Sequence, residues 1–165
     1  MRTFDAWSQS GSLNYLEPWK NSTILMREPR EGRVKVLIDT TVWSLVLRRR
    51  NPDARLVQLV AQLEQRDAAY MIGPVRQELL THLEPPERFR LLRDSIRSIR
   101  DLSLSSDDFE QAAALSTACR SRGIIASPTD FLIVAVARRE SAAVLSLDRD
   151  FDYIRKVIAF RRMDT

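Results

Sequence analysis

The sequence predicts an α/β domain built around a mainly parallel β-sheet. Short and almost fully apolar runs, such as Val36-Leu37-Ile38 and Val144-Leu145, are typical of strands that helices cover on both faces. Between these runs lie longer segments in which apolar residues recur with helical spacing. Regular alternation of strands and helices favours a parallel sheet, because each helix carries the chain back to the start of the next strand.

The first half of the domain is expected to contain two strands and four helices. The strands cover residues 34–38 and 68–72, and the helices cover residues 40–50, 52–66, 74–83 and a segment that begins at Pro85-Pro86. Pro74 suits the first turn of the third helix. Apolar residues support the second helix with i, i+3, i+4 and i+7 spacing and the fourth with 3-4-3 spacing. These residues are Leu56, Leu59, Val60 and Leu63, and then Phe89, Leu92, Ile96 and Ile99.

The second half continues the alternation. Ser105 or Ser106 is expected to cap a helix that ends at Gly123, and Ser127 to cap a second helix with Pro128 at its first position. A turn or short helix is expected at residues 148–153. The expected strands are residues 102–104, 142–147 and, at the edge of the sheet, 157–160.

The composition limits the kind of site that this protein can carry. The chain has 165 residues, which suits one domain, but only one histidine, one cysteine and four glycines. Glycine-rich phosphate loops, Cys/His zinc sites, disulfides within the chain and His-dependent nucleophilic sites are therefore excluded or unsupported. A chain without disulfides fits a reducing cytoplasm. No apolar stretch approaches the roughly 20 residues that span a bilayer, so we expect a cytoplasmic protein with no membrane partner.

The charge of the chain permits a nucleic-acid partner without establishing one. The formal net charge is +4, and Lys20, Lys35 and Lys156 are the only lysines in a basic set dominated by arginine. Arginine favours bidentate contact with phosphate. A solvated arginine-rich surface explains the charge equally well.

Residues 1–33 differ in character from the rest and are expected to form a poorly ordered N-terminal extension to a domain at residues 34–165. A second hypothesis is that translation of the native protein starts at Met26, because a compact pattern begins soon after it. N-terminal sequencing of the native protein decides between a start at Met26 and one at Met1.

Three acidic residues stand at the same expected edge of the sheet. Asp39 follows the first strand directly, and Asp148 follows the strand at residues 142–147. Ligand sites in open α/β sheets lie beyond the carboxyl ends of the strands. Asp130 lies in the first turn of a helix that continues with seven apolar residues, where an uncompensated charge is costly.

Glu78 is a fourth candidate acid. It lies about 60° from the buried position Val75 on its predicted helix, so it borders the core, as does His82 four residues later. A structural role for His82 is the simpler interpretation. Each acid also has an ordinary explanation, either as a helix-start carboxylate worth roughly 0.3–1 kcal/mol or as a surface residue.

The four acids taken together favour a metal site. Carboxylates at close range cannot all stay ionised without a counter-charge. An all-oxygen donor set with open water positions suits Mg²⁺ or Mn²⁺. Such cations promote phosphodiester hydrolysis by activating water and neutralising phosphate charge.

Four segments occur in an order and spacing that resemble a known family. They are residues 36–43 (Val-Leu-Ile-Asp-Thr-Thr-Val-Trp), 75–80 (Val-Arg-Gln-Glu-Leu-Leu), 129–135 (Thr-Asp-Phe-Leu-Ile-Val-Ala) and 144–151 (Val-Leu-Ser-Leu-Asp-Arg-Asp-Phe). The pattern resembles the PIN-domain ribonucleases, and most closely the VapC-type toxins of prokaryotic toxin–antitoxin pairs. The resemblance covers about residues 34–160. It implies a three-layer α/β/α domain whose mainly parallel sheet has four or five strands.

The resemblance also implies roles for individual residues. It assigns metal binding chiefly to Asp39 and Asp130, while Glu78 and Asp148 complete the acidic site by binding or orienting metal and water. Asp150 is an auxiliary candidate. Thr41 and Ser146 match positions where the family places small hydroxyl residues that support the acids. The chain departs from the family pattern at Ser146, where threonine is more usual, and at Val134, where alanine is commoner, but neither change removes a carboxylate.

The resemblance implies an Mg²⁺-dependent endoribonuclease, with Mn²⁺ as the alternative cation, that acts as the toxin of a type II toxin–antitoxin pair. The implied partners are an RNA substrate and a small antitoxin, and a homodimer is left open because family members are often dimers. Two alternatives also stay open. One is a PIN-type nuclease of RNA processing without an antitoxin, and the other is a catalytically silent module that binds RNA or protein.

Overall fold

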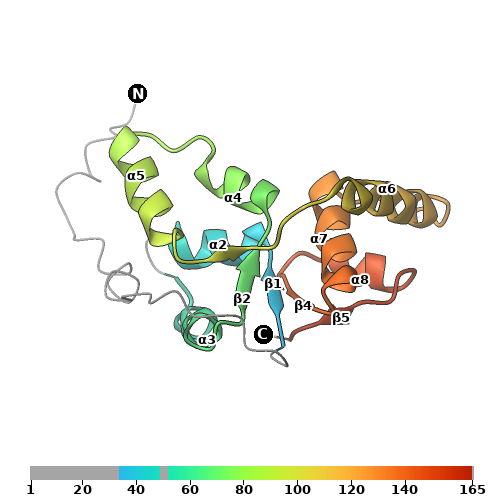
Figure 1. The fold of residues 1–165 in the computed structure, drawn as a ribbon, viewed down its shortest axis with the longest axis horizontal. Helices are drawn as coiled ribbons and strands as arrows, with labels where there is room; N and C mark the ends of the chain where they lie inside the picture. Colours follow the sequence, from blue (N-terminus) through green and yellow to red (C-terminus); the bar gives the residue numbers. More distant parts are fainter. Residues whose placement is uncertain (1–33, 49–51, 165) are drawn as a thin grey trace.

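The protein folds around a five-stranded parallel sheet with helices on its two faces (Figure 1). The computed structural model describes residues 34–48 and 52–164. Within them the strand order is β3-β2-β1-β4-β5, and every neighbouring pair is parallel. The strands are β1 (Val36–Ile38), β2 (Ala69–Met71), β3 (Arg100–Asp101), β4 (Ala143–Leu145) and β5 (Arg161–Arg162). The predicted fold class is therefore confirmed.

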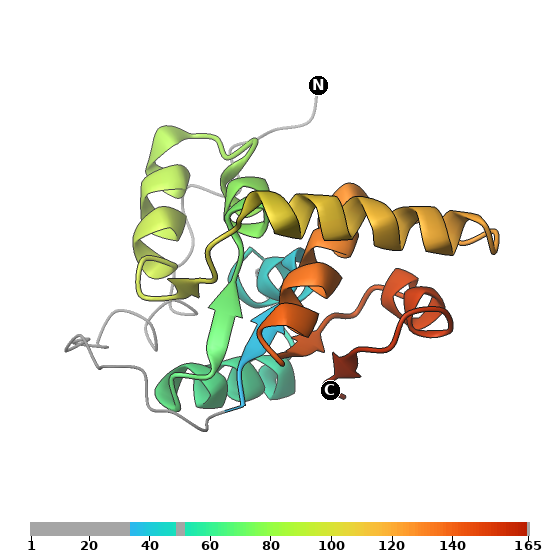
Figure 2. The same cartoon turned by 45° about the vertical axis from the view of Figure 1, so that its right-hand side comes forward.

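Seven helices connect the strands in the described part of the chain. They are α2 (Thr40–Leu47), α3 (Ala54–Gln65), α4 (Gly73–Leu80), α5 (Pro86–Ser95), α6 (Ser106–Arg120), α7 (Pro128–Arg139) and α8 (Asp150–Arg155). Helix α7 packs on both α6 and β4, whereas α3 packs on β2 and α2. In Figure 2, α6 and α7 pass in front of the strands and α2 lies behind them, which gives the three layers. None of these helices is long and apolar enough to cross a membrane.

The predicted helix boundaries with polar caps are confirmed. Ser105 and Ser127 each begin a helix with a reciprocal capping box, in which an acid three residues later accepts from the serine backbone N–H. Asp53 caps α3 by accepting from the first backbone N–H groups of that helix. After α6, Gly123 adopts a φ of 75°, the left-handed conformation that glycine tolerates best at a helix end.

The core lies between the central strands and the helices on either side. Leu37 of β1 is fully buried and pairs with both Tyr70 of β2 and Val144 of β4. Helix α7 is buried without interruption from Asp130 to Ala137, as its apolar run predicts. This burial matters for the site because it brings the charged first turn of α7 against the sheet.

The helix expected from Pro85-Pro86 to Ile99 is shorter than its apolar spacing suggests. Helix α5 ends at Ser95, while Ile96 and Ile99 are buried from the turns that follow it. Arg76 of α4 donates to the carbonyl oxygens of Ile96 at 2.9 Å and Ile99 at 2.7 Å. This guanidinium satisfies carbonyl groups that a continued helix would have bonded internally, so the chain turns there.

The two edge strands lie beside the positions predicted for them. The expected strand at 102–104 is replaced by Arg100–Asp101, and the one at 157–160 by Arg161–Arg162. The apolar residues of the predicted segments pack on the core instead, as Phe160 does edge-to-face against Phe151, with ring centroids 6.4 Å apart. The apolar pattern therefore predicts the segments whose side chains are buried. It does not predict the charged residues whose backbones pair with the neighbouring strands. The expectations about residues 1–33 and a start at Met26 lie outside the described residues.

Candidate active site

The four predicted acids line a single pocket of about 210 Å³ at the carboxyl edge of the sheet. The parallel strands end at this edge, so the residues that follow β1 and β4 are brought together with the first turn of α7. A larger groove of about 660 Å³ lies at the opposite, amino edge and contains none of these acids. The lining of the acidic pocket consists of Asp39, Thr40, Thr41, Glu78, Ser127, Thr129, Asp130, Asp148 and Asp150.

Asp39 is the most enclosed of these acids, with 4% of its surface exposed. Its Oδ2 accepts hydrogen bonds from the Thr41 hydroxyl at 2.6 Å, the Ser146 hydroxyl at 2.8 Å and the Thr41 backbone N–H at 3.3 Å. The last of these bonds makes Asp39 the N-cap of α2. Thr41 and Ser146 therefore support this acid, as the resemblance implies.

Glu78 reaches the pocket from α4 and is exposed, so it does not border the core as its helical position predicts. The hydroxyl of Thr40 donates to its Oε2 at 2.9 Å. A second threonine beside Asp39 is the one feature of the sequence that hints at this contact. His82 lies beyond the end of α4 with a φ of 58°, is exposed, and does not line the pocket.

Asp130 takes part in the cap of α7 and also has a pKa that its surroundings shift. Its Oδ2 accepts from the Ser127 backbone N–H at 2.8 Å, which completes the capping box of α7. Burial raises the pKa of Asp130 to about 6, although the hydrogen bonds with Ser127 act to lower it, and the charges of Asp39 and Asp148 raise it further. The raised pKa of Asp130 thus reflects mainly its burial, with a smaller contribution from the negative charges of the neighbouring acids.

Asp148 and Asp150 lie on the connection between β4 and α8. The Asp148 backbone N–H donates to the Ser146 hydroxyl at 3.0 Å, and Asp148 Oδ1 accepts from the Asp150 backbone N–H at 2.9 Å. Ser146 also bonds Asp39, so one hydroxyl links the segments that carry two of the acids.

A common pattern unites Asp39, Glu78, Asp130 and Asp148. In each of them, one carboxylate oxygen accepts hydrogen bonds from the described residues, and the other oxygen accepts none. Each carboxylate is thus anchored by one oxygen and keeps a second oxygen for another partner. Oriented carboxylates with one open oxygen are suited to hold a hard divalent cation.

The charge of the pocket agrees with that donor set. Five of its lining residues are acids, and none is lysine, arginine or histidine. Across residues 34–48 and 52–164, however, no three Asp, Glu, His or Cys side chains are already arranged as ligands of one ion. The residues therefore fit a divalent cation by donor chemistry and charge, and their side chains would have to converge to hold one.

Comparison with known proteins agrees with this fold and pocket. The sequence signature of the PIN domain matches residues 36–157, which contain all four acids. The chain belongs to the PIN domain family. This PIN domain protein is 27% identical over 124 residues to VapC ribonuclease Mb1587 of Mycobacterium bovis and to ribonuclease VapC11 of Mycobacterium tuberculosis. In both cases the match covers 74% of this chain and 92% of the relative.

Solved structures show the same fold at lower identity. FitAcB of Neisseria gonorrhoeae has a TM-score of 0.60 and 21% identity, and covers 76% of this chain and 96% of its own. VapBC2 of Rickettsia felis, solved bound to a DNA fragment from its promoter, has a TM-score of 0.62 and 18% identity over the same shares. The resemblance to PIN-domain ribonucleases of the VapC type is thereby confirmed.

Proposed function

We propose that this PIN domain protein is a metal-dependent endoribonuclease and the toxin of a type II toxin–antitoxin pair. The observation that carries the proposal is the pocket in which Asp39, Glu78, Asp130 and Asp148 meet, each with one carboxylate oxygen left open. The relatives named as VapC ribonucleases support RNA as the substrate.

In such a site, the acids and the neighbouring hydroxyl residues have different roles. Asp39 and Asp130 are the chief ligands of Mg²⁺ or Mn²⁺, and Glu78 and Asp148 complete the set by binding or orienting metal and water. A bound cation supplies a more acidic water and neutralises phosphate charge. Thr41 and Ser146 keep Oδ2 of Asp39 occupied, so its other oxygen faces no competing donor from the described residues. Thr40 holds one oxygen of Glu78 in the same way.

RNA cleavage by the purified full chain tests this proposal. We expect cleavage with Mg²⁺, none with EDTA, and recovery when Mg²⁺ or Mn²⁺ is restored in excess. Asp39→Asn and Asp130→Asn should each abolish cleavage while circular dichroism stays unchanged. Asp107→Asn, an exposed acid in the first turn of α6, is the matched control and should cleave normally. Full activity of both pocket variants would refute the assignment.

The proposed partner is a small antitoxin encoded beside this chain. Co-expression with the product of a short neighbouring reading frame should yield a complex in which RNA cleavage is inhibited. Cleavage without such a neighbour favours a nuclease of RNA processing, whereas absence of both metal binding and cleavage favours a silent binding module. A homodimer is also proposed, and light scattering of the isolated chain measures it directly.

A further inference from the structure

Beyond the acids themselves, the site depends on the connection between β4 and α8. Within that connection, the Ser146 hydroxyl donates to Asp39 Oδ2 at 2.8 Å and accepts from the Asp148 backbone N–H at 3.0 Å. A shift of the Ser146 backbone would therefore move Asp148 relative to Asp39. Asp148 and Asp39 can share a pocket only if a further contact holds the Ser146 backbone in place.

Arg162 of β5 makes that contact. Its Nη2 donates to the Ser146 carbonyl oxygen at 2.9 Å, and its Nη1 forms an ion pair with Asp152 of α8. Only 13% of the Arg162 side chain is exposed, whereas the Asp152 side chain is 56% exposed. The planar guanidinium of Arg162 thus contacts both the start of the connection and α8, the helix that follows the connection.

The register of β5 against β4 explains how Arg162 reaches Ser146. Arg162 contributes to the groove at the amino edge of the sheet, whereas Ser146 leads to the acidic pocket at the carboxyl edge. Arg162 pairs with Val144, and the Met163 backbone N–H donates to the Val144 carbonyl at 2.9 Å. Side chains two residues apart along a strand share a face, so Ser146 lies one step beyond Val144 on the face to which Arg162 points.

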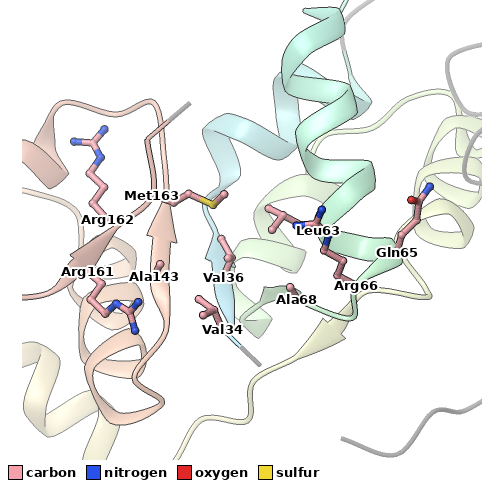
Figure 3. A pocket seen from close by; sticks show the side chains of 10 residues that line it. All are labelled: Val34, Val36, Leu63, Gln65, Arg66, Ala68, Ala143, Arg161, Arg162 and Met163. Carbon is pink, nitrogen blue, oxygen red and sulfur yellow. The ribbon is translucent and has the colours of Figure 1, made fainter. Parts of the chain in front are cut away.

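The neighbouring Arg161 provides a natural comparison. Arg161 and Arg162 both contribute to the groove at the amino edge of the sheet, but Figure 3 shows their side chains extending in opposite directions from β5. Arg161 is exposed, and no hydrogen bond or ion pair ties its side chain to the described residues. The two arginines share strand, charge and size, and differ in exposure and in the contacts that Arg162 makes with Ser146 and Asp152.

We propose that Arg162 is a positioning residue for the acidic pocket, which holds Asp148 and Asp39 in register through the Ser146 carbonyl. The inference rests on the proposed metal site. It extends that site to a residue of the last strand that is not part of the pocket lining. Loss of a group that orients metal ligands lowers metal affinity by about 10- to 100-fold.

Mn²⁺ binding tests this role without reference to cleavage. The full chain is titrated with Mn²⁺, and free Mn²⁺ is measured by its electron paramagnetic resonance signal below the melting temperature of each variant. Arg162→Met should raise the Kd by about tenfold or more, and Arg162→Lys, which has one donor head and no fork, by about threefold. Arg161→Met, the matched control, should bind as the wild type does. A wild-type Kd for Arg162→Met would overturn the proposal.

Two further variants separate the explanations. Asp152→Asn removes the ion pair and leaves the Ser146 contact, so its Kd should stay within about twofold of the wild type if the carbonyl carries the effect. An equal loss in Asp152→Asn and Arg162→Met would overturn the role of Ser146. If Arg162→Met does not fold, Arg162→Lys against Arg161→Lys decides, and equal Kd values refute the proposal.

Asp39→Asn distinguishes failure of this inference from failure of the proposed function. Loss of Mn²⁺ binding in Asp39→Asn together with normal binding in Arg162→Met would remove the positioning role alone. Normal binding in Asp39→Asn would remove the metal site, and the role of Arg162 would fall with it.

Discussion

Replacement of Asp130 by asparagine should make the metal-free protein more stable at neutral pH while it removes function. Asparagine has the same shape as aspartate and keeps an oxygen that can accept from the Ser127 N–H, so the capping box of α7 survives. The substitution removes a charge that burial and the acids Asp39 and Asp148 disfavour. Ionised Asp130 thus costs stability that the proposed cation offsets.

The pKa of Asp130 sets the size of the effect. A rise from 3.8 to about 6 corresponds to about 3 kcal/mol at most above pH 6. The pocket opens to solvent, which screens the charge, so about half of this value is a better measure. The neutral residue also loses roughly 0.3–1 kcal/mol of attraction to the positive helix end. We therefore expect Asp130→Asn to gain about 1 kcal/mol at pH 7.5.

The sign of the pH dependence follows from the raised pKa. Below pH 3.8 the carboxyl is protonated in both the folded and the unfolded chain, and its ionisation costs nothing. Between pH 3.8 and about 6 the unfolded chain has released this proton while the folded protein still retains it, so stability falls as pH rises across this window and levels off above it. The advantage of Asp130→Asn should thus shrink to about half at pH 5.

Urea denaturation with EDTA, followed by circular dichroism at pH 7.5 and 5, measures these differences. With Mg²⁺ in place of EDTA, the wild type should gain stability and Asp130→Asn should not, because a ligand stabilises only the folded state that binds it. Asp107→Asn is the control and should lose a few tenths of a kcal/mol, roughly the value of an exposed helix-start charge. A metal-free Asp130→Asn less stable than the wild type at pH 7.5 would refute the reasoning.

Three other substitutions test separate parts of the structure. Thr41→Val removes the 2.6 Å hydrogen bond to Asp39 and should weaken Mn²⁺ binding by about tenfold in calorimetric titration, whereas Thr117→Val on the exposed face of α6 should not. Arg76→Met leaves the carbonyl groups of Ile96 and Ile99 without their donor and removes the ion pair with the exposed Asp101, and should lower the free energy of unfolding in urea by about 2–4 kcal/mol. Gly123→Ala places a side chain at a φ of 75°, where space is free but the backbone is strained, and should cost about 1 kcal/mol in the same assay.

Sequence reasoning succeeded where local pattern and burial coincide. The central strands β1 and β4 are apolar because helices cover both their faces, so periodicity and turn residues located them within two residues or so. The acids that follow β1 and β4 could be placed at one edge because parallel strands end together. The edge strands β3 and β5 escaped detection because they consist of two charged residues each and carry no apolar pattern.

Contacts between residues distant in sequence could not be predicted from the periodicity of apolar residues. Arg76 and Arg162 each use a guanidinium to hold backbone carbonyls on another element, and nothing in their local sequence distinguishes them from the surrounding arginines. The bond from Thr40 to Glu78 likewise depends on how α2 packs on α4. Such bonds are set by tertiary geometry, so a single sequence indicates the residue types and leaves the partners open.

The ordinary and the functional explanations of the acids turn out to be compatible. Asp39 is the N-cap of α2 and Asp130 belongs to the capping box of α7, as expected for helix-start carboxylates. Each of these roles occupies one carboxylate oxygen and orients the other. A cap fixes the side chain with short local bonds, and the sheet brings two such caps to the same edge. Helix capping would therefore supply the orientation that a metal ligand needs, so the cap role of these residues is compatible with the role proposed for them.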